Sequence, residues 1–188
     1  MEDKFNTAYG IRYGLMAGFF SLGMGFTYYL FSSAIFSSFW LPTLTGLASL
    51  AVVILLATLG AITYRNENQG VITLGQGVGT AIMVFFIAAV FSTATQWIIP
   101  NLIDKQYPER TAALLKEKVG AQMEKWGAPD EAIEKAMKDM GPEKFNPDAA
   151  ATAKNFGIMM IFYVFISVVI GAFVKRNSKD MIKVENAS

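Results

Sequence analysis

Three long stretches of this 188-residue chain contain no charged side chain. Residues 13–64 form 52 consecutive uncharged positions, residues 68–103 form 36 and residues 155–174 form 20. Only 16% of all residues are charged, whereas about 25% are charged in an ordinary soluble domain. A small water-soluble domain cannot bury three such stretches, so the sequence predicts an integral membrane protein.

The same composition excludes several classes of function. The chain has no cysteine and no histidine, which removes disulfides, thiolate chemistry, classical zinc sites and the usual general base. Its net charge is only +1, whereas proteins that bind nucleic acids by electrostatic attraction are usually strongly basic. The uncharged stretches also lack the Asp, Glu, Lys and Arg side chains that bind protons or ions in membrane pumps. We therefore expect a protein that is not an enzyme, with no cofactor, metal or nucleic-acid partner.

The uncharged stretches divide into four predicted membrane spans. A membrane helix needs about 20 mostly apolar residues, so the longest stretch fits two helices that are separated at residues 37–42, where Pro42 disfavours a continuous helix. The first span is too long for a cleaved signal peptide, and we expect it to remain as an anchor. The prediction is an all-α, integral membrane four-helix bundle in one domain, residues 1–188, with spans at 11–36, 43–64, 71–99 and 155–174.

The distribution of Lys and Arg predicts the orientation. Counting all nine positive residues of segment 100–154 would favour the inverted orientation, but long segments cross largely regardless of charge. Counting only positions near span ends, seven positive residues share the side of the termini and four lie opposite, so both termini are predicted to be cytoplasmic. The seven are Lys4, Arg12, Arg65, Lys175, Arg176, Lys179 and Lys183, and the four are Lys105, Arg110, Lys144 and Lys154.

Segment 100–154 is predicted to form an amphipathic helical hairpin between the third and fourth spans. The turn Gly127-Ala128-Pro129 separates two helical patterns, each with an apolar face. The segment is too small for a core of its own. Its apolar faces must therefore cover each other, the bundle, the lipid surface or a protein partner. The candidate docking face comprises Leu115, Val119, Trp126, Ile133, Met137 and Met140.

Small residues recur every four positions near the start of two spans. Gly10, Gly14 and Gly18 belong to the first row, and Gly75 and Gly79 to the second. Such rows let helix backbones approach closely where lipid offers no hydrophobic contrast. We expect these glycines to pack helices together, either within the bundle or between two copies of the chain as a homo-oligomer.

Two alternative functions need other residues. A transporter or lipid-handling subunit would need a groove between spans, with Gln76 and Gln96 as its candidate polar contacts. A membrane enzyme would need several carboxylates to converge on one site. The acidic candidates are Asp104, Glu109, Asp130 and Asp148.

Three motifs together resemble one bacterial family. They are residues 64–77 (YRNENQGVITLGQG), Ile103-Asp104, and residues 123–134 (MEKWGAPDEAIE). Over nearly its whole length the chain resembles domain-of-unknown-function family 4199 of Bacteroidota, although Pro129 stands where many relatives have Ser. The resemblance implies a four-span inner-membrane protein without an assigned activity, and it carries over no catalytic or binding residues. It also points toward cell-envelope assembly from lipid-linked sugars.

The leading functional prediction is a structural or accessory protein of the bacterial inner membrane. Its bundle would lie in the lipid bilayer, and residues 100–154 would present the docking face on the periplasmic side. The partner there would be a membrane or periplasmic protein, or the lipid itself.

Overall fold

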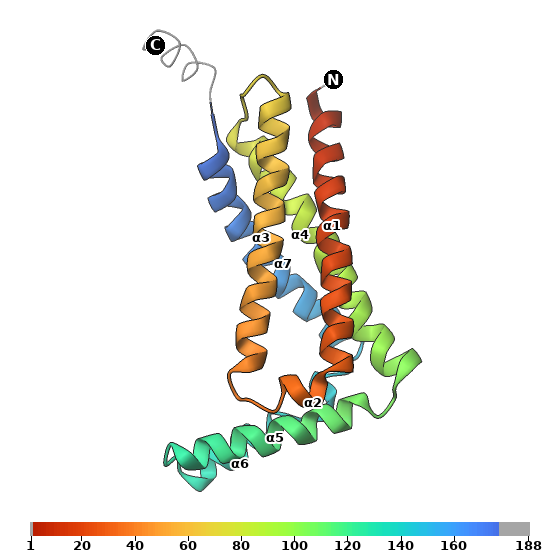
Figure 1. The fold of residues 1–188 in the computed structure, drawn as a ribbon, viewed down its shortest axis with the longest axis vertical. Helices are drawn as coiled ribbons and strands as arrows, with labels where there is room; N and C mark the ends of the chain where they lie inside the picture. The colour runs from red at the N-terminus through yellow and green to blue at the C-terminus, as the bar shows by residue number, and fades with distance from the viewer. Residues whose placement is uncertain (1, 177–188) are drawn as a thin grey trace. The chain divides into compact units, whose positions relative to one another are not determined.

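The structure is a computed structural model that describes residues 2–176, with side chains from Thr7 onward; the side chains of Lys4, Lys179 and Lys183 lie outside it. Among the described residues, all regular structure is helical apart from one isolated bridge between Ile72 and Arg176. The all-α prediction is therefore confirmed. The α-helices are α1 (Glu2–Leu30), α2 (Ser32–Ile35), α3 (Leu41–Glu67), α4 (Leu74–Ile98), α5 (Tyr107–Lys125), α6 (Asp130–Lys138) and α7 (Ala149–Val174) (Figure 1).

Three helical segments are long and apolar enough to cross a membrane. They are Leu41–Glu67, Leu74–Ile103 and Ala149–Val174, which correspond to the second, third and fourth predicted spans. Helix α1 has 29 residues but is not among them, because five glycines and four tyrosines dilute its apolar side chains. Its role as a span therefore stays a prediction.

The helix ends differ from the predicted span limits. The first span was predicted to reach residue 36, but α1 ends at Leu30 and the short α2 follows. Serines in this region bond to the local backbone instead of supporting a continuous helix, as Ser37 Oγ does by donating to Ala34 O at 2.6 Å. Helix α7 begins at Ala149, six residues before the predicted span, because Asp148 Oδ1 accepts from the N–H of Ala151 at 2.7 Å and caps it.

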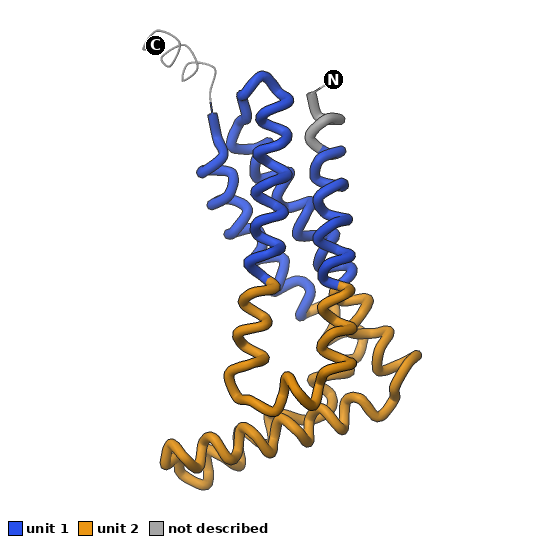
Figure 2. Tube along the Cα trace, in the orientation of Figure 1, with its two compact units in different colours: residues 1–21, 50–91, 155–188 blue, residues 22–49, 92–154 orange. Residues whose placement is uncertain are grey.

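The chain divides into two compact units, each built from several segments (Figure 2). Unit 1 comprises Met1–Ser21, Leu50–Phe91 and Asn155–Ser188, and unit 2 comprises Leu22–Ser49 and Ser92–Lys154. The prediction of one domain, residues 1–188, that includes segment 100–154 stays a prediction. Helices α1, α3, α4 and α7 contribute residues to both compact units, a property that the charge pattern does not reveal.

Unit 1 holds the main buried cluster of the described residues. Its largest fully buried side chain is Phe85, whose ring stacks on Tyr163 with centroids 4.5 Å apart and planes at 14°. Most of its other members are alanine or branched aliphatic residues, and the alanines allow the helices to approach closely. The cluster is Ala17, Val53, Ala57, Ala61, Tyr64, Ile72, Ala81, Val84, Phe85, Ala88, Ile170 and Val174.

Candidate interaction surface

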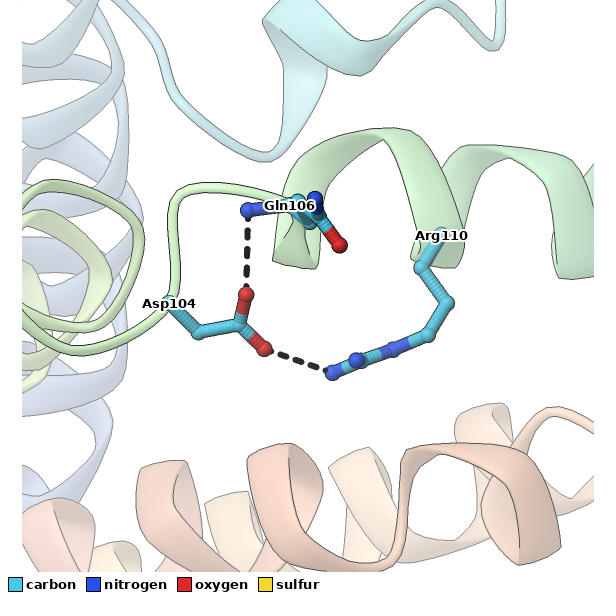
Figure 3. A network of polar contacts seen from close by, with 3 residues as sticks. All are labelled: Asp104, Gln106 and Arg110. Atoms are coloured by element: carbon cyan, nitrogen blue, oxygen red, sulfur yellow. Dashed lines mark hydrogen bonds and ion pairs between the residues drawn. The ribbon is translucent and has the colours of Figure 1, made fainter.

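A corner in unit 2 directs the chain from α4 into α5. The π-helical turn Ile99–Ile103 ends at Asp104, whose Oδ1 accepts from the backbone N–H of Gln106 at 3.0 Å and whose Oδ2 accepts from Arg110 Nη2 at 2.9 Å (Figure 3). One carboxylate thus holds both the loop and the first turn of α5. Asp104 is used for positioning, although sequence analysis had singled it out as a candidate acid.

The first half of α5 packs within unit 2. Thr111 and Ala112 are buried, α5 contacts α2, and the Tyr107 ring lies edge-on to Tyr29 with centroids 5.5 Å apart. Burial raises the pKa of Tyr107 above its ordinary value. This half of α5 therefore covers other residues of its own unit.

The second half of α5 packs on α6. Gly120 is buried, and a methyl group added there would overlap Met137 Cε. The turn between the helices is a Schellman motif: Ala128 N–H donates to Met123 O and Gly127 N–H donates to Glu124 O, both at 3.0 Å. Gly127 has φ +71°, a left-handed conformation that suits glycine. The turn that the sequence predicted at 127–129 is present.

Five members of the predicted docking face are half-buried and one is exposed. The half-buried residues are Leu115, Val119, Ile133, Met137 and Met140. Trp126, the C-cap of α5, keeps 59% of its surface exposed. The structure therefore brings much of this face into contact with unit 2 itself and leaves its aromatic end open.

Trp126 belongs to a cluster of three rings, which we call the aromatic patch: Phe39, Trp40 and Trp126. Phe39 lies edge-on to Trp40 at 5.0 Å and to Trp126 at 5.3 Å, and the two tryptophan centroids are 6.5 Å apart. Trp40 is 58% exposed. The sequence does not reveal the contact between the two tryptophans, because 86 positions separate them and no periodic pattern connects a loop to a helix end.

The glycine row of α1 lies against α4 in unit 1. An ideal Cβ at Gly10 would lie 2.8 Å from Met83 Cβ, one at Gly14 2.6 Å from Ile87 Cδ1, and one at Gly18 2.9 Å from the Phe91 ring. The three partners on α4 are also spaced by four. A side chain at any of these three positions would force its neighbour on α4 to shift, so glycine suits this close approach.

Gly75, in the second predicted row, does not make such a contact with the described residues. Nothing lies within 4 Å of a Cβ at Gly75, and Gly79 is exposed. The close approach instead falls on Gly77, where a Cβ would lie 3.0 Å from Gly171 Cα. Two residues turn an α-helix by about 200°, so α7 covers the face of α4 opposite Gly75, and the prediction of a close contact is corrected at Gly75.

The two glutamines proposed for a polar groove have local partners. Gln76 Oε1 accepts from the N–H of Thr73 at 2.9 Å, and Gln76 N–H donates to Thr73 Oγ1 at 3.2 Å. This reciprocal pair is a capping box at the start of α4, which the Thr-x-x-Gln spacing could have revealed. Gln96, at the other end of α4, is exposed and donates from Nε2 to Ser92 Oγ at 3.4 Å. These contacts do not indicate a groove at either residue.

The acidic candidates are distributed over separate elements. Asp104 lies at the corner before α5, Glu109 in its first turn, Asp130 in the first turn of α6 and Asp148 at the cap of α7. In the part of the chain that the structure describes, no three acidic side chains gather in a way that could hold a metal ion.

Polar contacts join segments at one end of unit 1. Tyr9 OH donates to Glu67, and this hydrogen bond raises the pKa of Tyr9. Ile72 and Arg176 exchange two backbone hydrogen bonds of 3.0 Å, and Arg65 Nη1 donates to Val174 O at 3.4 Å. The start of α1, the α3–α4 loop and the end of α7 therefore lie together.

Comparisons with known proteins give one match. No curated protein and no solved structure matches this chain. A family model described as "Protein of unknown function (DUF4199)" matches residues 12–176. The chain therefore belongs to the DUF4199 family, as its motifs had suggested.

Proposed function

We propose that this chain is a four-span protein of the bacterial inner membrane with both termini in the cytoplasm. Helices α3, α4 and α7 have the length and apolarity of spans, and α1 joins them through its glycine row on α4. The polar contacts of Tyr9, Ile72 and Arg176 support a common side for the termini and the α3–α4 loop. Arg12, Arg65, Lys175 and Arg176 supply the positive charge expected on the cytoplasmic side.

We further propose a structural or accessory role, carried by unit 2 at the periplasmic surface. The observation behind this proposal is the aromatic patch, in which two tryptophans from distant segments contact each other and stay more than half exposed. Exposed aromatic groups that are held in place are typical of interaction surfaces. Segment 107–138 would work as an amphipathic hairpin that carries one edge of the patch.

Cysteine labelling tests the topology, since the native chain has no cysteine. Glu131→Cys places a thiol on α6, and the matched variant Asn66→Cys places one at the end of α3; both positions are exposed. In spheroplasts, a membrane-impermeant maleimide should label Glu131→Cys at once and Asn66→Cys only after permeabilisation. The reverse pattern would overturn the orientation.

Epitope tags at the two termini test the number of spans. Both tags should be protected from protease in spheroplasts, because an even number of spans returns the chain to its starting side. Protection of the C-terminal tag alone would show that α1 does not cross the membrane.

A further inference from the structure

We propose that the aromatic patch docks in the headgroup region of the surrounding lipid bilayer and holds the α5–α6 segment flat on the membrane surface. This inference rests on the proposed topology and deepens it by naming lipid as the partner. A protein partner is the competing occupant, and the experiment below separates the two.

The position of Trp40 in the chain sets its depth in the bilayer. Trp40 directly precedes Leu41, the first residue of a candidate span, and tryptophans at span ends prefer the level of the lipid headgroups. Leu41, Leu44 and Leu47 in the first turns of α3 are 37%, 58% and 58% exposed. Apolar residues exposed at the start of a span suit contact with acyl chains. Trp40 therefore marks the boundary between the headgroups and the hydrocarbon.

Contact with Trp40 places Trp126 at the same depth. The two rings lie 6.5 Å apart, and Phe39 is in contact with both. Trp126 is the C-cap of α5, so the last turn of α5 shares the headgroup level. A Trp126 side chain that pointed into water would expose an indole ring without gain, whereas headgroups suit both its apolar ring and its N–H.

The end of α4 and the turn that leads into α5 also carry exposed apolar side chains. Trp97, Leu102 and Ile103 precede α5 in unit 2 and are 52%, 69% and 48% exposed. Within unit 2, α5 runs across the direction of the last turns of α1 and the first turns of α3 (Figure 1). A helix that lies across these turns, with exposed apolar groups at its C-cap and in the segment before it, has the placement of an interfacial helix.

The charge balance of the segment selects the kind of lipid contact. Residues 107–138 contain six positive and six negative side chains, so electrostatic attraction to anionic headgroups is not favoured. Docking would depend on insertion of the aromatic rings, and should be insensitive to lipid charge and to salt. The charged residues are Arg110, Lys116, Lys118, Lys125, Lys135 and Lys138, with Glu109, Glu117, Glu124, Asp130, Glu131 and Glu134.

Depth-dependent quenching of single tryptophans tests the inference on the full chain in vesicles. The W40F/W97F variant keeps only Trp126, because the chain has three tryptophans. Phosphatidylcholine brominated at different acyl positions should quench Trp126 most from the shallowest position, as for burial about 5–10 Å into the headgroup–acyl boundary. Adding phosphatidylglycerol or salt should leave this quenching unchanged.

A matched control reports a position on the water side of the same segment. In the W40F/W97F/W126F background, Lys138→Trp on α6 replaces a side chain that is 76% exposed. Its fluorescence should be quenched by aqueous iodide and not by brominated lipid. Equal iodide quenching of Trp126 and of this control, without quenching by brominated lipid, would overturn the inference and assign the patch to a protein.

A second single-tryptophan variant separates failure of this inference from failure of the topology. The W97F/W126F variant keeps only Trp40, which the proposed topology places at the membrane boundary. If Trp40 is quenched by brominated lipid and Trp126 is not, the topology stands and lipid docking is wrong. If neither is quenched, the proposed membrane placement of α3 is wrong as well.

Trp126→Glu provides a test that does not use fluorescence. In vesicles, amide hydrogen exchange in α5 and α6 should increase, because a carboxylate at this position opposes insertion. Exchange in unit 1 should stay unchanged. An unchanged exchange rate in α5 and α6 would contradict docking through Trp126.

Discussion

The two units use their side chains in opposite ways. In unit 1, described residues such as Ala57, Ala61 and Phe85 are almost completely buried in one cluster. In unit 2 the buried hydrophobic residues are fewer, with Ile35, Phe36, Ile99 and Ala112 among them. All three tryptophans of the chain belong to unit 2 and are more than half exposed. The comparison shows that the large buried cluster belongs to unit 1, whereas unit 2 keeps its tryptophans at the surface.

The rows of small residues are longer in unit 1 than in unit 2. Helices of unit 1 meet at glycine and alanine, so their backbones come close and gain packing that lipid alone does not provide. Unit 2 also has close glycine contacts, at Gly25 with Thr95 and at Gly120 with Met137, but its exposed patch is built from phenylalanine and tryptophan rings, and tryptophan carries a polar N–H beside its apolar ring. The following variants test this difference, from the largest expected effect to the smallest.

Gly14→Leu should have the largest effect, because it inserts a side chain where Ile87 Cδ1 lies 2.6 Å from an ideal Cβ. We expect a loss of about 3 kcal/mol or more of unfolding free energy, at or above the upper range for overpacked cores. Thermal melting in detergent measures this loss. Gly23→Leu on the same helix is the control, since nothing lies within 4 Å of its Cβ. Equal melting of both variants would contradict the packing role of Gly14.

Trp126→Ala should open α5 and α6 while unit 1 stays folded. The variant removes the ring contacts with Phe39 and Trp40, which are worth about 0.5–1.5 kcal/mol each beyond buried area. Hydrogen exchange should rise in residues 107–138 and not in α4. Trp97→Ala leaves the patch intact and should show no such rise. If Trp126→Ala instead lowered the stability of the whole chain, the two units would not be independent.

Gly127→Ala should have a smaller and local effect. Nothing lies within 4 Å of a Cβ at this position, so the cost is that of the positive φ alone, roughly 1–2 kcal/mol for a non-glycine residue. The α5–α6 turn should show faster exchange. Gly157→Ala in α7, also in open space, should be neutral or stabilising. If Gly127→Ala left hydrogen exchange in the turn unchanged, the turn would not depend on this left-handed conformation.

High pH should have the smallest effect and should act on both units. The pKa of Tyr9 is raised by its hydrogen bond to Glu67 and that of Tyr107 by burial, so folding favours the neutral phenols. The stability that this contributes is present below the ordinary pKa of 10.0 and is lost as pH rises through the raised values. Melting temperature should therefore fall from pH 9 to about 11.

Phenylalanine variants assign this alkaline loss to each unit. Tyr9→Phe should reduce the pH dependence of the stability of unit 1, and Tyr107→Phe should reduce the pH dependence of the stability of α5. Because Tyr9 lies at the surface, its variant should change the slope less than Tyr107→Phe. A slope unchanged by both variants would mean that other groups cause the loss.

The sequence alone determined the helical architecture, the apolar segments that became α3, α4 and α7, and the turn at Gly127. These are local properties, because charge, hydropathy, proline and glycine act on the residues around them. Local caps could also have been found: Thr73 with Gln76 has the spacing of a capping box. A glutamine in a long apolar segment also fits a polar contact inside a membrane, so the cap is not the only interpretation of Gln76.

Only the tertiary structure decided which helix faces meet and which distant residues touch. Gly75 and Gly77 are both small, but α7 covers the face of Gly77, and spacing along one helix does not say where its neighbour lies. The contact of Trp40 with Trp126 and the division into two units likewise depend on how separate helices pack. Packing is a relation between segments, whereas the patterns in a sequence describe each segment by itself.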